Sequence, residues 1–321
     1  MTRDQLSSFI TRWGGSASLA LLDPACNIFT HPSVEGAIGY LVRRKCMVAF
    51  GDPVCSTENL SPLTEAFHSF AQEKAHPVIY LTASKNFADW AMQHGCQSLF
   101  EVVEELVIDP STYPKKGPLG RLLNKKFNHA QHAGVVIKEY TERNSALEKE
   151  LLDVENLWLK GRKGPQIYMS KIDFFEEREG KRCFYAEQNG AVVGVLFLIK
   201  LEAQEGWLLY LVMTTPTAAG GTSESLIVSA LDKLAEEGCR SFSFGISAAE
   251  EIGNIVGLHP FFAWGSRFIF KTVKKMFSLD NRRKFWEKFA PQKKPAYVLL
   301  SRPTIGLKEL IAIMRTVNAG F

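Results

Sequence analysis

The sequence lacks the short motifs that mark many metal and nucleotide sites. Its six cysteines are scattered along 321 residues and form no C-x-x-C pair, which argues against a zinc site or a disulfide framework and favours buried free thiols. No H-E-x-x-H, P-loop or G-x-G-x-x-G is present. We therefore expect neither a metal nor a cofactor.

Long apolar runs are also missing. The longest, such as residues 191–199, have the length of a strand and fall short of the roughly 20 residues that a membrane span needs. Residues 1–13 include Asp4 and have no long apolar core, so they do not resemble a secretory signal. With 46% hydrophobic and 22% charged residues, the chain is typical of a globular protein and is long enough for two domains.

Basic residues are concentrated in two segments, although the net charge is only +4. Residues 271–294 hold nine Lys or Arg against Asp280 and Glu287. Residues 111–128 hold no acid, and their bases are Lys115, Lys116, Arg121, Lys125 and Lys126. Such segments are either solvated faces or surfaces for the phosphates of nucleic acid or lipid, and charge alone favours the solvated face.

The order of the expected elements is repeated along the chain. In each half an apolar run opened by glycine, 36–42 or 190–197, precedes a second apolar run, 46–50 or 207–213. An amphipathic helix with apolar residues three and four positions apart follows. These helices are marked by Leu63, Phe67, Phe70 and Ala71 in one half and by Leu226, Ala230, Leu231 and Leu234 in the other.

Both halves are then expected to close in the same way. The opening helices of the two halves are expected at 3–13 and 145–161. After the amphipathic helices, strands are expected at 77–82 and 241–246 and short helices at 87–94 and 248–256. The closing strands are expected at 105–108 and 297–300. This order predicts an α/β fold of two domains, 1–140 and 141–321, with mixed sheets covered by helices. Residues 110–120, rich in Pro, Gly and Lys, are expected to form a linker.

Two glycine-containing segments are candidates for a site. Residues 51–53, Gly-Asp-Pro, follow an apolar strand, and a turn needs such residues whether or not Asp52 has a function. Strand ends in α/β sheets are also where ligand crevices open. Residues 220–224, Gly-Gly-Thr-Ser-Glu, precede the second helix, where they could offer N–H groups to an anion, or Thr or Ser could cap the helix while Glu224 favours its first turn.

The segment 282–297 interleaves bases with aromatic residues. Such a mixture can bind phosphates and stack on nucleobases, but Phe285 and Phe289, four apart, favour a helix that packs them inward. Lys288 could still point into a cleft. His129 and His132 lie three apart without a third ligand nearby, so two surface histidines are favoured over a metal site.

Two stretches resemble a known family: VAFGDPV at 48–54 and FWEKFAPQKKPAYVLL at 285–300. They look like the soluble C-terminal domain of the aminoacyl-phosphatidylglycerol synthases, also called multiple peptide resistance factors. The resemblance covers nearly the whole chain. Its most specific part is the pattern of Phe285, Lys288, Phe289, Pro291, Pro295 and Tyr297. It implies two tandem acyltransferase units of the GNAT type, as in the peptidoglycan Fem ligases.

The resemblance implies transfer of an aminoacyl group from charged tRNA to a lipid hydroxyl or a related acceptor. Such a reaction needs a carboxylate or base, a donor for the oxyanion and a basic surface for tRNA. Lys288 would supply positive charge, Asp52 and Glu224 polar contacts, and Tyr297 a group that closes the site. The remaining expected contacts are Tyr210, Arg121, Asn124 and Lys125, with Lys126, Lys274 and Lys275 on the phosphate-facing surface.

The chain departs from this family on the second central strand. The lipid-modifying enzymes carry Asp-Leu-Met-Arg where this chain has Tyr-Leu-Val-Met at 210–213. Two alternatives therefore stay open. One is an acyl-CoA-dependent N-acyltransferase, which needs a pyrophosphate-binding loop before a central helix. The other is a non-catalytic tandem-GNAT protein that binds tRNA or membrane.

We expect a cytoplasmic protein that acts at the inner membrane face, with aminoacyl-tRNA and an anionic lipid surface as partners. The C-terminal segment 306–315 has apolar residues on one side and is expected to be an amphipathic helix. Packing on the second domain is favoured over membrane docking.

Overall fold

The computed structural model describes residues 1–161, 174–175, 178–251, 253–257 and 279–317. The strands are β1 (Asn27–His31), β2 (Val34–Arg43), β3 (Cys46–Phe50), β4 (Val54–Cys55), β5 (Val78–Ala83), β6 (Ser98–Ile108), β7 (Val135–Glu139), β8 (Lys181–Gln188), β9 (Ala191–Leu201), β10 (Gly206–Thr214), β11 (Ser241–Ala248), β12 (Ile255–Val256) and β13 (Gln292–Leu300). The helices are α1 (Arg3–Trp13), α2 (Leu60–Glu73), α3 (Lys85–Ala91), α4 (Gly117–His132), α5 (Ser145–Gly161), α6 (Thr222–Glu236), α8 (Leu279–Glu287) and α9 (Leu307–Thr316).

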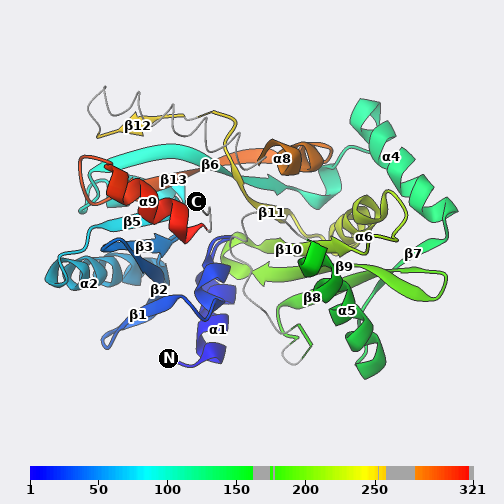
Figure 1. Cartoon of the computed structure of the whole chain (residues 1–321), viewed down its shortest axis with the longest axis horizontal. Helices are drawn as coiled ribbons and strands as arrows, with labels where there is room; N and C mark the ends of the chain where they lie inside the picture. The colour runs from blue at the N-terminus through cyan, green and yellow to red at the C-terminus, as the bar shows by residue number, and fades with distance from the viewer. Residues whose placement is uncertain (162–173, 176–177, 252, 258–278, 318–321) are drawn as a thin grey trace.

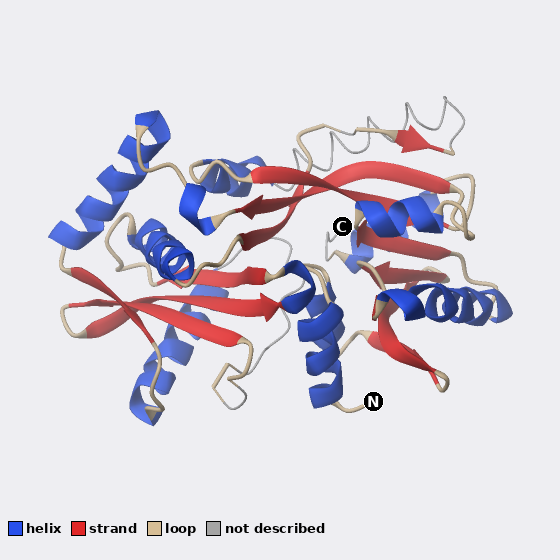
Figure 2. Cartoon of the chain, turned by 180° about the vertical axis from the view of Figure 1, so that it is seen from behind, coloured by secondary structure: helices blue, strands red, loops and turns tan. Residues whose placement is uncertain are grey.

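Among these residues the strands form one continuous mixed sheet that crosses the whole molecule (Figures 1 and 2). Its order is β1-β2-β3-β5-β13-β6-β11-β10-β9-β8-β7, with β4 beside β2 and β12 beside β6. The pairs β3–β5 and β10–β11 are parallel, and the other pairs are antiparallel. A mixed α/β sheet covered by helices, as expected from the sequence, is confirmed.

Successive side chains of a strand point to opposite faces of the sheet, so the core that each residue joins shows which helices cover that face. In the second half Leu196 and Leu198 of β9 belong to the core under α4, α6 and α8, whereas Phe197 belongs to the core on the opposite face. In the first half α2 and α3 cover one face through a core of their own. The strand period of two therefore explains why both faces of the sheet are covered.

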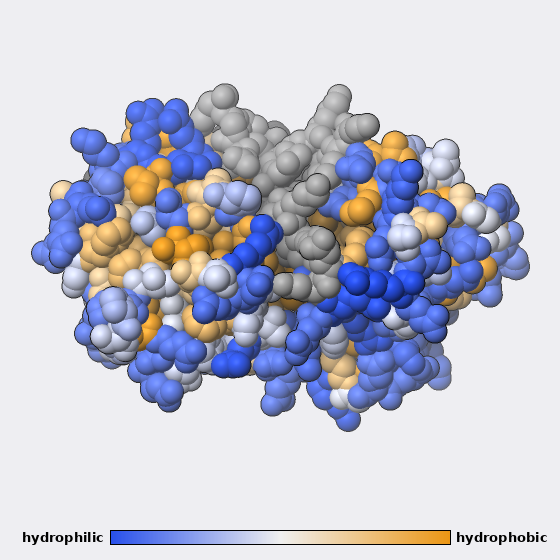
Figure 3. All heavy atoms as spheres, turned by 90° about the horizontal axis from the view of Figure 1, so that it is seen from below, coloured by the Kyte–Doolittle hydropathy of each residue, from blue (hydrophilic) through white to orange (hydrophobic). Residues whose placement is uncertain are grey.

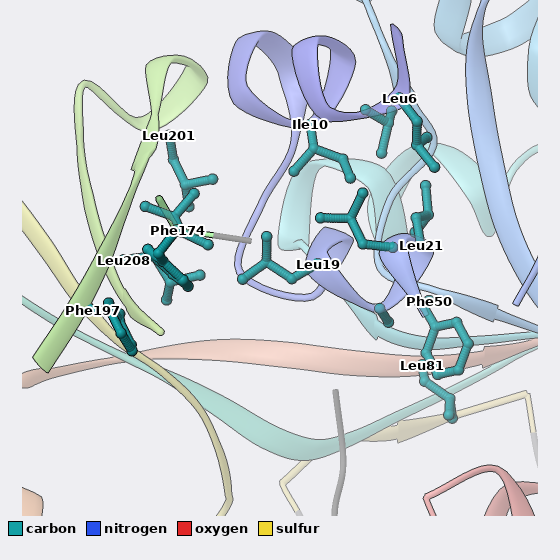
Figure 4. Packing of buried hydrophobic residues seen from close by; sticks show 14 of the residues in the cluster. Leu6, Ile10, Leu19, Leu21, Phe50, Leu81, Phe174, Phe197, Leu201 and Leu208 are labelled. Atoms are coloured by element: carbon teal, nitrogen blue, oxygen red, sulfur yellow. The ribbon is translucent and has the colours of Figure 1, made fainter. Parts of the chain in front are cut away.

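The core that contains Phe197 also joins the two halves. It contains Leu6 and Ile10 of α1 and residues 19–22 of the 3₁₀ helix η1 (Ser18–Leu22). Figure 4 shows Ile10 and Leu19 between Leu201 and Leu208 of the second half and Phe50 and Leu81 of the first, with Leu6 and Leu21 above Phe50. The opening helix therefore connects the halves instead of covering one of them.

Most expected elements are present. The opening helices are α1 and α5, the repeated helices are α2 and α6, and α3 follows β5 as predicted. The glycine-led apolar runs lie in β2 and β9, and the runs after them are β3 and β10. Each of these elements has a strong local period, which is why the sequence reveals it.

The expected closing strand of the second half was assigned wrongly. Residues 297–300 lie in β13, but β13 pairs with β5 and β6 of the first half. In turn, β6 pairs on its other edge with β11, from Val103↔Ala248 to Ile108↔Phe242. The two halves thus interlock through β6 and β13. The hydrophobic pattern of a strand shows which of its faces is buried, but it does not show which other strand it pairs with.

Three local expectations were also wrong. The helix expected at 248–256 is absent from the described residues there, where β11 ends and β12 forms. The expected linker at 110–120 contains a 3₁₀ turn and the start of α4. The C-terminal helix α9 packs on β2 and β3 of the first half. Because β7 pairs with β8, residues 135–139 lie in the sheet of the second half, and the boundary near residue 140 stays a prediction.

Candidate functional site

A cavity of about 600 Å³ lies where the two halves meet. Its wall comes from the turn after α1, the end of β3, the start of α3, and from β6, β11 and β13. The polar side chains that line it include Ser16, Asp52, Ser84, Lys85, Glu105 and Lys294. A cavity of this size fits a small organic group.

Asp52 occupies the turn at the end of β3. Gly51 has φ of +66°, which suits glycine and redirects the chain as the sequence predicts. The Ser84 N–H donates to Asp52 Oδ1 at 2.8 Å, and Ser84 caps α3. Burial raises the pKa of Asp52 above its usual value, the hydrogen bonds from Ser84 oppose this, and the charge of Glu105 adds to it.

Glu105 brings a second carboxylate to the same cavity. The Ser243 hydroxyl of β11 donates to Glu105 Oε1 at 2.7 Å, and the Ser16 hydroxyl donates to the same oxygen. The two hydroxyl oxygens lie 3.1 Å apart. Within the described part of the chain Oε2 has no hydrogen-bond partner. Segments from both halves therefore orient this carboxylate, which the sequence analysis did not single out.

Two ammonium groups also line the cavity. Lys85 Nζ is held 2.6 Å from Asp89, so its charge is balanced outside the cavity. Lys294 of β13 has no ion pair with any described residue. The arrangement of two carboxylates with one unbalanced lysine suits a ligand that carries both an ammonium group and a polar acyl group.

Lys288 and Glu224 form the other candidate centre. Lys288 Nζ lies 2.7 Å from Glu224 Oε1 and 4.6 Å from the ring centre of Phe285. Glu224 is in the first turn of α6, as expected, and its side chain is 7% exposed against 22% for Lys288. The pair joins the end of α8 to the start of α6.

The two centres lie on opposite faces of the sheet. Trp286 and Phe289, beside Lys288, pack on Phe244 of β11 at ring distances of 5.2 and 5.4 Å. Ser243, the next residue on β11, points to Glu105 on the other face. The sequence placed Lys288, Glu224 and Asp52 in one site, and the structure does not bring them together.

The two candidate tyrosines do not line the cavity. Tyr297 is buried in the core of the first half, and burial raises the pKa of its hydroxyl. Tyr210 is the bulged residue of β10, and its ring lies 5.5 Å from that of Phe174. Both rings pack against apolar neighbours, so a direct substrate contact for either stays a prediction.

The remaining candidates lie on or beyond α4. Arg121, Asn124 and Lys125 are exposed on this helix, away from the cavity lining. Lys126 is partly buried. Lys274 and Lys275 lie outside the described residues. Their role in binding phosphates stays a prediction.

The start of α6 differs from a phosphate-binding loop. Gly221 is the N-cap with φ of +98°, and neither Thr222 nor Ser223 caps the helix. A Cβ at Gly221 would lie 2.1 Å from the Lys126 carbonyl oxygen. Glycine is required here because the backbone of α4 packs directly against it. His129 of α4 hydrogen-bonds the Gly220 carbonyl at 2.7 Å, and the described residues contain no group of three potential metal ligands.

The residues that sequence reasoning missed have a weak local signal. Glu104 and Glu105 are consecutive in β6, so one carboxylate must face each side of the sheet. Glu105 faces the cavity, and Glu104 forms an ion pair with Arg283 at 3.2 Å on the α8 face. Two consecutive acids in a strand place a carboxylate on each face of the sheet, so Glu104 and Glu105 could have been recognised as candidate site residues from the sequence.

The structure is a mixed α/β sheet built from two halves, with a polar cavity where they meet. A family model described as "Phosphatidylglycerol lysyltransferase, C-terminal" matches residues 10–300. The chain therefore belongs to the phosphatidylglycerol lysyltransferase C-terminal family, as the sequence resemblance implied.

Named relatives are distant and longer. A phosphatidylglycerol lysyltransferase of Bacillus subtilis is 24% identical over 306 residues, which cover 92% of this chain and 34% of that protein. One from Staphylococcus haemolyticus is 20% identical over 97% of this chain and 37% of its own length. The chain thus spans about a third of the relatives that it matches.

Solved structures show the same fold. L-PGS from Bacillus licheniformis matches with a TM-score of 0.79 at 18% identity, over 99% of this chain and 97% of that one. The C-terminal domain of a putative lysylphosphatidylglycerol synthetase from Agrobacterium fabrum matches with a TM-score of 0.77 at 17% identity, over 97% and 94%. The mixed α/β architecture expected from the sequence is the fold of these solved structures.

In the part of the chain that the structure describes, no helix has the length and apolar character to cross a bilayer. On the face seen from below, hydrophobic residues reach the surface in patches among hydrophilic ones (Figure 3).

Proposed function

We propose that this protein transfers an aminoacyl group from aminoacyl-tRNA to a hydroxyl of phosphatidylglycerol or a related lipid. Family membership supports this reaction class. The reaction exchanges one ester for another: the lipid oxygen bonds to the acyl carbon, the bond to the ribose oxygen breaks, and the lipid hydroxyl proton goes to the departing ribose oxygen. No energy-supplying cofactor is required, because the charged tRNA already carries an activated ester.

The observation that carries the proposal is the pair of carboxylates in the cavity. An aminoacyl group has an ammonium next to its ester, and the group must be held by something anionic. Asp52 and Glu105 supply that charge in a partly desolvated setting, where charge-assisted hydrogen bonds are strong. They would take the role of the strand acid that the resemblance implies at the position where this chain has Tyr210.

Lys288 and Glu224 are proposed to act by positioning. Their ion pair joins α8 to α6, and β13 begins shortly after Lys288. Lys294, Pro295 and Ala296 of β13 line the cavity, so a displaced α8 would move part of its wall. A direct contact of Lys288 with the oxyanion is the competing prediction, and a substrate complex separates the two.

The acyl-CoA alternative has less support. It needs free N–H groups before a central helix to hold a pyrophosphate. At the start of α6 the Lys126 backbone packs against Gly221, and no glycine-rich phosphate loop precedes the helix. The aminoacyl-tRNA reaction would place the protein in the cytoplasm, at the inner face of the membrane.

A transfer assay tests the proposal. Purified protein is mixed with radiolabelled total aminoacyl-tRNA and detergent-dispersed phosphatidylglycerol, and label in the lipid is counted. Asp52→Asn and Glu105→Gln are each expected to lower kcat/KM about 10- to 100-fold, the value of a charged hydrogen bond. Asp153→Asn and Glu150→Gln, on the exposed side of α5, make the same changes away from the cavity and should keep full activity.

Two results would count against the proposal. Retention of tRNA without labelled lipid, by a folded wild-type protein, would favour the non-catalytic alternative. Activity unaffected by Asp52→Asn and Glu105→Gln would move the reaction site to the Lys288 side. Lys288→Met with a normal KM and a reduced kcat would then indicate a contact with the oxyanion.

A further inference from the structure

The helix α4 is the centre of a segment that carries only positive charge. Residues 110–138 contain no Asp or Glu, and their bases are Lys115, Lys116, Arg121, Lys125, Lys126 and Lys138. The helix stands at one end of the molecule, outside the sheet (Figure 1). It packs on α6 and β7.

Two of these bases are neutralised by acids on neighbouring elements. Lys115 Nζ lies 3.1 Å from Asp232 of α6, and Lys138 Nζ lies 2.8 Å from Glu187 of β8. The other four make no ion pair with any described residue; they are Lys116, Arg121, Lys125 and Lys126. No acid of the described residues neutralises them, so their charge is available to an anionic partner.

The position of each side chain follows from the helical period. Gly120, Leu123 and Ala130 are buried and define the inward face. Arg121 and Lys125 are four apart on the outward face. Leu122 lies beside them and Leu119 at the margin, and their exposed fractions are 36% and 38%.

Exposed leucines beside unpaired bases distinguish between anionic partners. Nucleic acid offers phosphates to the bases but little for an aliphatic side chain, since its readers stack aromatic rings or Arg on the bases. A bilayer with anionic headgroups offers phosphates at its surface and acyl chains just below, which matches bases and leucines on one helix face.

We propose that the outward face of α4 docks the protein on an anionic lipid bilayer. This proposal adds a lipid-docking surface to the proposed function, but its test requires no catalysis. Docking there would hold the adjoining start of α6, with the Glu224–Lys288 ion pair, near the membrane surface, because α4 packs against Gly221.

Sedimentation with vesicles tests this surface. The whole protein is expected to bind vesicles of phosphatidylcholine with phosphatidylglycerol, to bind phosphatidylcholine alone weakly, and to dissociate as salt rises. Arg121→Gln/Lys125→Gln should weaken binding about 30-fold, from about fivefold for each base near an anionic surface. Leu119→Gln/Leu122→Gln should weaken it about tenfold, since only part of each side chain leaves water.

Lys74→Gln/Lys149→Gln is the matched control. It removes the same charge from two exposed positions, one at the C-cap of α2 and one on α5, and should leave binding within about twofold of wild type. Circular dichroism verifies the fold of each variant.

Three outcomes would overturn the proposal. Equal losses in the control and the α4 variants would mean that net charge alone binds the vesicles. Unchanged binding after the leucine substitutions would remove the bilayer contact. Loss of tRNA retention in Arg121→Gln/Lys125→Gln, with vesicle binding intact, would assign the face to nucleic acid. Lipid transfer is measured separately in detergent, so failure of docking and failure of catalysis are distinguishable.

Discussion

Arg283 provides the sharpest test of how the two halves are held together. Its side chain is 6% exposed and lies 3.2 Å from Glu104 of β6, 3.0 Å from Glu287 and 3.3 Å from Glu250. It also donates to the Ala248 carbonyl at 3.2 Å. One guanidinium therefore links α8 to both β6 and the end of β11.

Substituting Arg283→Met would leave Glu104 without its counter-charge. Glu104 is 17% exposed, and its Oε2 makes no hydrogen bond among the described residues. Removing one partner of a buried ion pair costs about 3–5 kcal/mol of unfolding free energy. Glu250 and Glu287 are much more exposed, so their pairs contribute little to this total.

Urea unfolding measures the effect, followed by tryptophan fluorescence and circular dichroism. Trp286, one of six tryptophans, is buried on the same helix and packs on Phe244, so α8 contributes to the fluorescence signal. Coincident transitions by the two methods would justify a two-state free energy. Lys284 is an exposed neighbour on α8. Lys284→Met also replaces a base with methionine and should lower the free energy of unfolding by less than about 0.5 kcal/mol.

The double variant Arg283→Met/Glu104→Gln completes the cycle. Removing both charges should recover most of the loss, because the penalty comes from an unpaired buried carboxylate. A single Arg283→Met variant within about 1 kcal/mol of wild type would refute the reasoning. So would a double variant as unstable as the sum of the singles.

Three further predictions concern packing, pH and thiols. Gly221→Ala would drive a Cβ against the Lys126 carbonyl, so limited proteolysis should cut α4 faster in this variant while wild type resists. Burial raises the pKa of Asp52 above its ordinary value of 3.8, so just above that pH the folded state binds more protons than the unfolded state. The contribution of this carboxyl to stability therefore falls as pH rises through that range. Asp52→Asn should remove this pH-dependent contribution from the Tm measured between about pH 4 and 7. Burial raises the pKa of Cys96 to about 12 and also raises that of Cys183, so iodoacetamide should label both thiols in urea and neither in the native protein, as read by mass spectrometry.

The local elements of this protein could be predicted from its sequence. The apolar spacing in α2 and α6, the glycine-led runs of β2 and β9 and the turn at Gly51 each depend on residues only a few positions apart. Helical and strand periods are properties of such short windows. The family was also recognisable, because the pattern around Lys288 is a contiguous segment.

The site depended on contacts that no short window contains. Asp52 and Glu105 share a cavity because β3 and β6 lie in one sheet with β5 and β13 between them, and backbone hydrogen bonds between strands carry no sequence signature. The same pairing places Lys288 and Asp52 on opposite faces, although both belong to the recognised segments. By itself the sequence determined the elements with a strong local period, such as α2, α6, β2 and β9, since those follow from short windows and turn chemistry. Only the tertiary structure decided which strands interlock and which charges meet, since long-range pairing depends on the packing of the whole chain.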